Sequence, residues 1–385
     1  MKIGIIDAEL IYNKKHRFPN LVSMKISGYH KNKGGNVSLL LNYDDIEKYD
    51  KVYISKVFTD TQVPEKVLAF SNVQYGGTGF FYDKAPPLPY EIEHCMPDYH
   101  LYDEWVKNQL ENGITKKLLK YYTDYSIGFA TRGCIRQCNF CVNKHYKKSE
   151  KHSGIAEFID NSRPYICLLD DNVLACSDWK IIFDELISTG KRLVFKQGID
   201  ERLLTDEKCD YIFNKIKWIG DYIFAFDNIA DKDLIISKLK LIRKYNDKKI
   251  KFYVLCGYNY QNNIYDEEFW KNDIISLFER IKILIEYGCI PYVMRYEKYN
   301  SSCYRGIYIN AAAWCNQPNL FKKMTFSDFC KQRGMSVKGN KIYRNDFKSY
   351  IKDGNKKGAA WRYLDEFTAL YPDTAEKYFC MKGEM

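Results

Sequence analysis

Apolar residues fall along the chain in short runs separated by amphipathic stretches, a pattern typical of alternating strands and helices. In the first hundred residues these runs predict strands at 2–7, 37–41, 51–57 and 72–74, with an amphipathic helix at about 19–31 after the first strand. Short strands separated by helices form parallel, doubly wound sheets. We therefore expect an N-terminal α/β domain over residues 1–105, in which prolines at 86, 87, 89 and 97 mark a connecting segment, and then a linker helix over 106–125.

A second and longer alternation begins at about residue 126. Its six strands are predicted to start near Ile127, Tyr165, Leu193, Tyr222, Lys251 and Ile290. Successive starts lie 28 to 39 residues apart, which is the length of a strand, a crossover helix and two loops. Six such units over 126–318 fit a (βα)6 partial TIM barrel, and the periodicity alone fits an open doubly wound sheet almost equally well.

The segment after residue 319 loses this rhythm and is expected to be a small, mainly helical C-terminal extension over 319–385. Residues 320–362 hold twelve Lys and Arg against three Asp, in a chain whose whole net charge is +10, and aromatic residues are interleaved among them. Basic and aromatic side chains together can neutralise phosphates and stack on bases, which predicts nucleic acid as a partner. The alternative is a solvated basic face whose aromatic rings pack inward.

Composition excludes general disorder, because 46% of the 385 residues are hydrophobic and can bury a large core. Asp7 interrupts the first apolar run too early for a signal peptide, and no stretch approaches the ~18 uncharged apolar residues of a membrane span. We expect a cytoplasmic protein with no membrane partner. In a reducing compartment the thirteen cysteines are expected to be buried thiols or metal ligands rather than disulfides.

Three cysteines stand apart from the others, in the segment GCIRQCNFC at 133–141. Cys134, Cys138 and Cys141 have a Cys-x3-Cys-x2-Cys spacing on a loop that leaves the first strand of the second alternation. Three thiolates can ligate three irons of a four-iron four-sulfur (4Fe-4S) cluster and leave the fourth iron open. The open iron can chelate S-adenosylmethionine and pass an electron to its sulfonium, and Phe140 supplies an apolar surface beside the cluster.

This segment, with its aromatic residue before the last Cys and its place on the first strand, resembles the signature of the radical S-adenosylmethionine superfamily. The N-terminal unit is similar to the Rossmann-like, cobalamin-binding-like domain that precedes the barrel in one branch. The resemblance implies an anaerobic enzyme that cleaves S-adenosylmethionine reductively to a 5'-deoxyadenosyl radical, which abstracts hydrogen from a substrate that the sequence does not identify. It also implies a reductant such as flavodoxin or ferredoxin.

Other strand ends offer the groups that this cofactor would need. After the second strand, Asp170 or Asp171 would accept from the methionine amino group, and either of them fits. After the third strand, Gln197 is available and Arg202 suits a carboxylate. Asp227 follows the fourth strand, in reach of ribose hydroxyls, and Gly257 follows the fifth, where the backbone can approach adenine closely. Helix capping explains Asp and Asn after strands as well.

Several alternatives remain. His145 follows Cys141 by four residues and would complete a zinc site, so a non-catalytic nucleic-acid-binding protein with a structural iron-sulfur or zinc site is the rival hypothesis. No histidine stands in an Asp-x-His-x-x-Gly loop, which disfavours cobalamin, although some cobalamin users lack a His ligand. The only cysteine before Cys134 is Cys95, which disfavours a methylthiotransferase, and the later cysteines show no auxiliary-cluster spacing.

Overall fold

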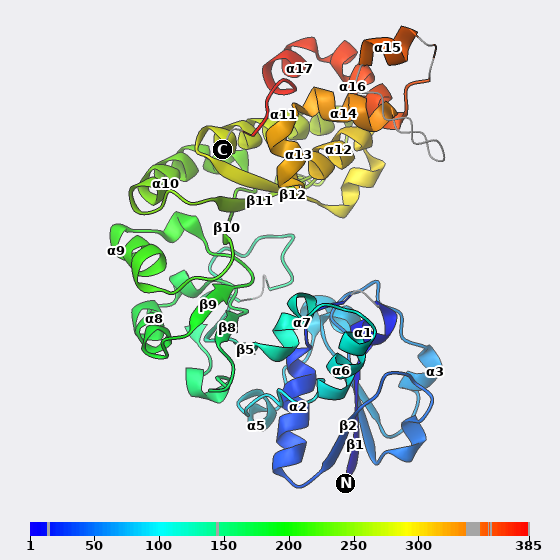
Figure 1. Ribbon diagram of the computed structural model, residues 1–385, viewed down its shortest axis with the longest axis vertical. Helices are drawn as coiled ribbons and strands as arrows, with labels where there is room; N and C mark the ends of the chain where they lie inside the picture. Colours follow the sequence, from blue (N-terminus) through cyan, green and yellow to red (C-terminus); the bar gives the residue numbers. More distant parts are fainter. Residues whose placement is uncertain (14–15, 144–145, 336–346, 353, 355, 384–385) are drawn as a thin grey trace. The chain divides into compact units, whose positions relative to one another are not determined.

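A computed structural model covers residues 1–385 and describes all of them except 14–15, 144–145, 336–346, 353, 355 and 384–385 (Figure 1). The chain is an α/β protein whose main sheets are built from parallel strands. It divides into two compact units. Unit 1 comprises Met1–Gln197 and Asn214–Ile219, and unit 2 comprises Gly198–Phe213 and Gly220–Met385.

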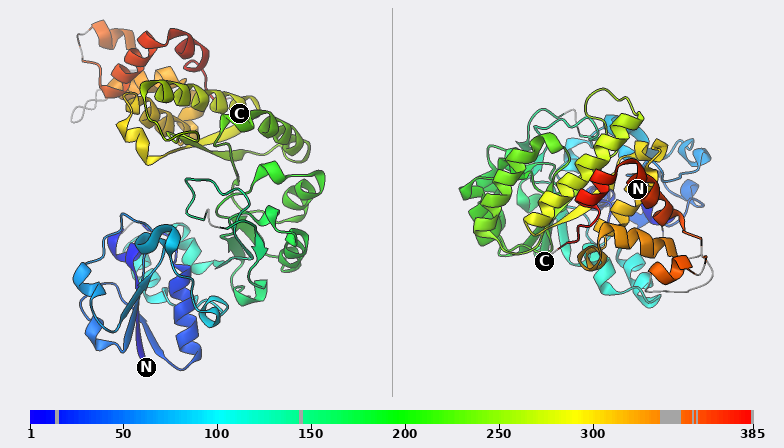
Figure 2. Two further views of the ribbon diagram at one scale, coloured as in Figure 1. Left: turned by 180° about the vertical axis from the view of Figure 1, so that it is seen from behind. Right: turned by 90° about the horizontal axis from the view of Figure 1, so that it is seen from above.

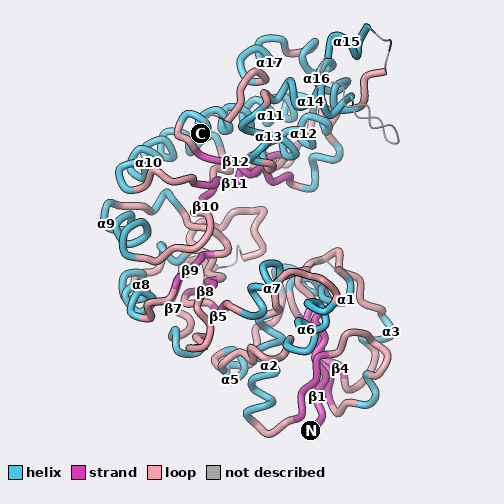
Figure 3. The backbone as a smooth tube through the Cα atoms, viewed as in Figure 1, coloured by secondary structure: helices cyan, strands magenta, loops and turns pink. Residues whose placement is uncertain are grey.

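The N-terminal part of unit 1 is a four-stranded parallel sheet, whose strands Figure 3 shows in magenta. Its strands are β1 (Lys2–Asp7), β2 (Asn36–Leu39), β3 (Lys51–Ser55) and β4 (Val73–Gly76), in the order β2-β1-β3-β4. Alternate residues of β1 enter different cores, because successive side chains of a strand point to opposite faces. Ile3 and Ile5 belong to one hydrophobic cluster and Ile6 to another, so apolar side chains cover both faces of the sheet.

Seven helices of unit 1 accompany this sheet and the linker that follows it. They are α1 (Ala8–Tyr12), α2 (Leu21–Asn32), α3 (Glu65–Leu68), α4 (Thr78–Phe81), α5 (Tyr90–Glu93), α6 (Asp103–Glu111) and α7 (Lys116–Thr123). Helix α2 begins after Asn20, whose side chain accepts a 3.1 Å hydrogen bond from the N–H of Ser23 and caps the first turn. Its buried residues Leu21, Met24 and Ile26 pack with Ile3 of the sheet.

A second parallel sheet of unit 1 follows the linker. Its strands β5 (Tyr125–Gly128), β8 (Tyr165–Leu168) and β9 (Arg192–Phe195) run in the order β5-β8-β9, and α8 (Trp179–Ser188) lies between β8 and β9 in the chain. Two short strands, β6 (Thr131–Arg132) and β7 (Glu150–Lys151), form an antiparallel pair directly after β5. This pair brackets the loop that carries the three cysteines.

Unit 2 contains the remaining parallel sheet, in the order β10-β11-β12. Its elements are α9 (Asp206–Asp210), β10 (Tyr222–Ala225), α10 (Lys232–Tyr245), β11 (Ile250–Cys256), α11 (Glu267–Glu286), β12 (Cys289–Arg295) and α12 (Arg305–Cys315). Residues of β11 alternate between buried and half-buried, and α11 packs on β11 and β12 (Figure 2). One face of this sheet is therefore covered by helix.

The C-terminal extension is helical where the structure describes it. It contains α13 (Pro318–Lys323), α14 (Phe326–Met335), α15 (Phe347–Lys352), α16 (Ala359–Leu370) and α17 (Pro372–Tyr378). Four aromatic residues of the basic segment, Phe326, Phe329, Tyr350 and Trp361, are buried. These four rings are in the core and not exposed for stacking on bases. The basic residues Lys338, Lys341 and Arg344 lie outside the described residues.

The strand positions expected from the sequence are confirmed. Each of the six later strands starts within two residues of its predicted start, and β1 spans residues 2–7 as expected. The six strands are not hydrogen-bonded into one continuous sheet among the described residues. They form two three-stranded sheets, β5-β8-β9 and β10-β11-β12. Within the described ranges, no helix is long and apolar enough to cross a membrane.

Candidate metal and cofactor site

The cysteine loop begins at a glycine that the backbone requires. Gly133 has a φ of +94°, a conformation that L side chains rarely adopt, and a Cβ there would lie 2.3 Å from the carbonyl oxygen of Lys148. The two ends of the loop are joined by β6 and β7, where Thr131 pairs with Lys151. The sequence therefore turns sharply out of the strand directly before Cys134.

The three thiols lie on one turn-rich segment and are half-buried. The backbone N–H of Arg136 donates to the sulfur of Cys134, and the N–H of Asn143 donates to the sulfur of Cys141, both at 3.4 Å. The N–H of Cys141 donates to the carbonyl of Cys138 at 2.9 Å. Hydrogen bonds to sulfur stabilise thiolates and tune iron-sulfur clusters. The donor set and its backbone N–H groups fit a thiolate-ligated cluster.

Among the residues that the structure describes, no three His, Cys, Asp or Glu side chains are arranged to hold a metal ion. His145, the fourth ligand of the alternative zinc site, lies outside the described residues. Phe140, next to Cys141, is half-buried.

Two neighbouring carboxylates anchor the loop from the end of β8. Asp170 is 1% exposed and accepts from the N–H of Ala130 at 3.1 Å and from the hydroxyl of Thr131 at 2.6 Å. Burial raises the pKa of Asp170 to about 6, although the Thr131 hydrogen bonds act in the opposite direction. Asp171 accepts from the N–H of Gly133 at 3.1 Å and from the side-chain amide of Asn143 at 2.6 Å.

These contacts separate the two aspartates that the sequence left equivalent. Asp170 fixes the strand that leads into the loop, whereas Asp171 holds the loop at residues on either side of its cysteines. Next to them, the side-chain amide of Asn172 donates to the sulfur of Cys134 at 3.4 Å. Gln197, the remaining candidate of unit 1, is exposed just after β9.

The other candidates belong to unit 2. Arg202 donates to Asp200 at 2.7 Å and to Asp231 at 3.2 Å, and these carboxylates raise the pKa of its guanidinium against the effect of burial. Its fork is therefore engaged by acidic side chains in this structure. Asp227 follows β10 and accepts from the N–H of Leu255 at 2.9 Å, and burial raises its pKa.

Gly257 lies just after β11 and its N–H is also engaged. Its φ is +78°, and its N–H donates to Asp273 at 2.7 Å, which also accepts from the hydroxyl of Tyr308 at 2.8 Å. Arg280 from α11 is 1% exposed and donates to the carbonyls of Asp227 and Leu255, both at 2.8 Å. The carboxyl ends of β10 and β11 are thus fixed by buried charged side chains.

Three buried carboxylates, Glu201, Asp7 and Glu9, are not among the site residues expected from the sequence. Glu201 stands beside Arg202, is 1% exposed, and has one carboxylate oxygen that lacks a hydrogen-bond partner among the described residues. Burial and the charge of Asp200 raise the pKa of Glu201 to about 8. Asp7 and Glu9 form a similar buried pair at the end of β1. The signal for this pair in the sequence is Asp7, an acidic residue that closes an apolar strand.

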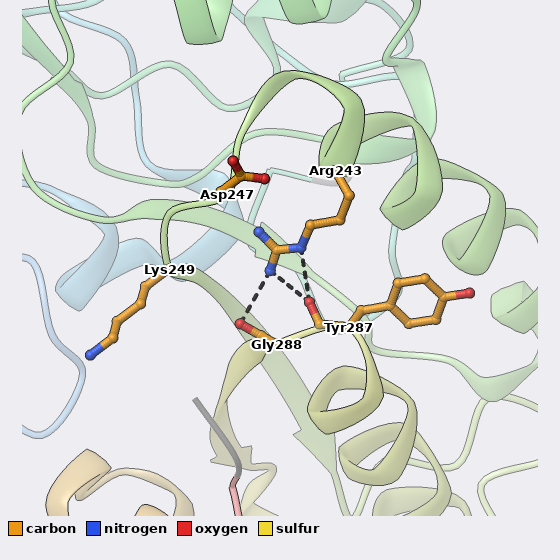
Figure 4. Close-up of a pocket in the computed structure, with 5 residues that line it drawn as sticks. All are labelled: Arg243, Asp247, Lys249, Tyr287 and Gly288. Atoms are coloured by element: carbon orange, nitrogen blue, oxygen red, sulfur yellow. Dashed lines mark hydrogen bonds between the residues drawn. The ribbon is translucent and has the colours of Figure 1, made fainter.

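A cavity of about 360 Å³ lies at the opposite, amino ends of β11 and β12 (Figure 4). Arg243 points across it and donates to the carbonyls of Tyr287 at 2.6 Å and Gly288 at 3.1 Å, whereas Lys249 points away. Further bonds join Arg243 to the carbonyls of Asn246 and Lys248. Because the guanidinium of Arg243 already donates to four backbone carbonyls, we assign this cavity a structural role and no ligand.

Comparison with models of known protein families and with curated proteins finds no match to this chain.

Proposed function

We propose that this protein is a radical S-adenosylmethionine enzyme, with Cys134, Cys138 and Cys141 as the ligands of a 4Fe-4S cluster. The observation that carries the proposal is the Cys-x3-Cys-x2-Cys loop, which leaves a strand of a parallel sheet and is tied to the end of the neighbouring strand by Asp171. When bound, the cluster and S-adenosylmethionine would supply a 5'-deoxyadenosyl radical that abstracts a hydrogen atom from the substrate.

The chain's own residues support this chemistry by position. Asp171 accepts hydrogen bonds from Gly133 and Asn143, which lie on either side of the three cysteines. These bonds fix the backbone conformation at both ends of the cysteine loop. The N–H groups of Arg136 and Asn143 donate to two of the sulfurs, as outer contacts do around metal ligands. Phe140 would contribute an apolar wall and limit the access of water to the cluster.

Residues that follow the ends of several strands are proposed to bind the cofactor. Asp171 is the more exposed of the two aspartates and would accept from the methionine amino group, with Asp170 fixing the backbone behind it. Arg202 would meet the carboxylate by exchanging one of its present acidic partners, while Asp227 and Gly257 would line the nucleoside. Gln197 would add a neutral hydrogen-bonding group.

The proposed architecture follows the same resemblance. Residues 1–105 would form a Rossmann-like, cobalamin-binding-like domain, 126–318 a (βα)6 partial TIM barrel and 319–385 a basic extension. The linker over 106–125, expected as one helix, contains the end of α6 and all of α7. Supporting this proposal, the first sheet is parallel with apolar cores on both faces, and the strands of each of the two later three-stranded sheets are parallel and lie in chain order. A flavodoxin or ferredoxin would supply the electron, and the 320–362 segment would offer positive charge to a nucleic-acid substrate.

Anaerobic reconstitution with iron and sulfide tests the metal assignment. We expect a brown protein with about four irons per chain and broad absorbance near roughly 400 nm. Replacing Cys134, Cys138 or Cys141 by Ala is expected to abolish both the bound iron and this absorbance. Cys95→Ala is the matched control, because Cys95 is also half-buried and its thiol donates only to backbone carbonyls. A colourless protein that binds one zinc would contradict the proposal.

A further inference from the structure

Two buried carboxylates lie at the carboxyl end of β1, away from the cysteine loop in the sequence. Asp7 is the last residue of β1 and Glu9 lies in the first turn of α1, and each is 1% exposed. Lysine or arginine usually pairs with carboxylates this deeply buried, because an uncompensated buried charge is costly. No salt bridge to either carboxylate is present among the described residues.

Each carboxylate is anchored through one oxygen only. The Oδ2 atom of Asp7 accepts from the hydroxyl of Tyr102 at 2.9 Å, and that hydroxyl in turn accepts from the N–H of Asn20 at 3.1 Å. The Oε1 atom of Glu9 accepts from the N–H groups of Val57 at 2.8 Å and Phe58 at 3.1 Å. These hydrogen bonds fix the orientation of the Asp7 and Glu9 carboxylates.

The second oxygen of each carboxylate is left unsatisfied. Asp7 Oδ1 and Glu9 Oε2 are buried and make no hydrogen bond within the described part of the chain, and the hydroxyl of Tyr43 is in the same condition. The charges of both Glu9 and Asp7 act on this phenol, so it lies within electrostatic reach of the pair. Three buried oxygen atoms that lack partners in the described part of the chain thus belong to groups that act electrostatically on one another.

These three groups lie at the carboxyl ends of the strands, the edge at which open α/β sheets usually bind ligands. Asp7 ends β1, Tyr43 follows the neighbouring β2, and Val57 and Phe58 follow β3 on the other side. The carboxyl ends of adjacent parallel strands form the usual ligand-binding edge of an open α/β sheet. Gly77 approaches the segment after β3 closely, because a Cβ on Gly77 would lie 2.2 Å from the carbonyl oxygen of Lys56.

We propose that Asp7 and Glu9 bind one divalent, oxygen-coordinated cation of the Mg²⁺ or Mn²⁺ class at this edge. The donors are oxygens only, which suits hard cations and not zinc or iron-sulfur chemistry. Two carboxylates match a double positive charge, and Tyr43 and water complete the coordination. Tyr102 and the N–H groups of Val57 and Phe58 orient the ligands, as outer contacts do in metal sites. This proposal does not rest on the proposed enzymatic function.

Mn²⁺ titration of the full chain, followed by electron paramagnetic resonance, tests the site. We expect about one bound Mn²⁺ per chain, displaced by Mg²⁺, with affinity at least about tenfold weaker in Asp7→Asn and in Glu9→Gln. Asp98→Asn is the matched control, because Asp98 is a largely buried carboxylate whose oxygens are engaged by Ser27, Lys31 and the N–H of His100. It is expected to bind Mn²⁺ as the wild type does.

A second measurement needs no variant and covers the case in which Asp7→Asn or Glu9→Gln fails to fold. Mn²⁺ at a substoichiometric level is expected to broaden the amide resonances of Val57 and Phe58 in the wild-type protein, because these amides contact Glu9. Absence of bound Mn²⁺, equal affinity in the variants, or sharp amide signals from Val57 and Phe58 would each overturn the proposal.

Discussion

The carboxylate of Asp171 accepts a 3.1 Å hydrogen bond from the backbone N–H of Gly133, the residue directly before Cys134. Its other oxygen accepts from Asn143, two residues after Cys141. One side chain at the end of β8 therefore holds the cysteine loop at both ends. The loop depends on a residue that is 30 positions away from its last cysteine in the sequence.

Replacing Asp171 by Asn is expected to loosen the loop. An amide retains one acceptor for Gly133 but presents an N–H group to the side chain of Asn143, so one bond is lost at a cost of about 1 kcal/mol. We expect the reconstituted cluster to be lost about fivefold faster to an iron chelator, followed by absorbance. Asp178→Asn is the control, because its contact with Ser177 is exposed and remote from the loop in sequence. Equal rates in the two variants would show that Asp171 does not support the cluster.

Gly133→Ala is expected to destabilise the protein more than an ordinary substitution at positive φ. The new Cβ would meet the Lys148 carbonyl at 2.3 Å in addition to the backbone strain. Gly113→Ala is the matched control, since Gly113 has a φ of +84° but no atom within 4 Å of its Cβ position. In urea unfolding, we expect Gly113→Ala to cost about 1 kcal/mol and Gly133→Ala about 1–3 kcal/mol more. If the unfolding curves of Gly133→Ala and Gly113→Ala were indistinguishable, the backbone near Lys148 would be able to move away from the new Cβ without cost.

Glu201 gives a pH dependence with a defined sign. Its pKa is raised from 4.5 to about 8 in the folded protein, chiefly by burial, so folding favours the protonated form. Its contribution to stability is present below pH 4.5 and is lost as the pH rises through about 8. We expect the melting temperature of the wild type to fall across this window for that reason.

Glu201→Gln should remove this component, because the amide stays neutral and can still accept from the N–H of Ala225. The variant is expected to melt close to the wild type at pH 5 and several degrees above it at pH 8.5, at about 2–4 °C per kcal/mol. Thermal unfolding at a series of pH values measures this difference. Glu207→Gln, at an exposed position of α9, serves as the control, and a difference between Glu201→Gln and the wild type that is constant with pH would contradict the assignment.

The strands could be predicted from the sequence because their signal is local. Apolar runs such as 222–225 and 250–256 stand between polar loops, and burial of one or both faces keeps them extended. A tight turn at Gly133 is likewise a local feature, since a glycine directly precedes the first cysteine. In these places, a few neighbouring residues determine the local structure.

Contacts between distant residues could not be predicted in this way. The sequence offers Asp170 and Asp171 as equals, and only the folded chain shows that one meets Thr131 and the other Gly133. Likewise, Arg202 looked available for a ligand, yet it donates to Asp231, which follows β10 in the chain. Asp7 accepts a hydrogen bond from the hydroxyl of Tyr102, 95 residues later in the chain.

The central claim is tested most directly by measuring 5'-deoxyadenosine. The reconstituted full-length protein is reduced with dithionite, incubated anaerobically with S-adenosylmethionine, and analysed by chromatography. We expect the wild type and Cys95→Ala to release 5'-deoxyadenosine and methionine in equal amounts, and Cys138→Ala to release neither. A wild-type protein that carries about four irons per chain and releases no 5'-deoxyadenosine would contradict the assignment.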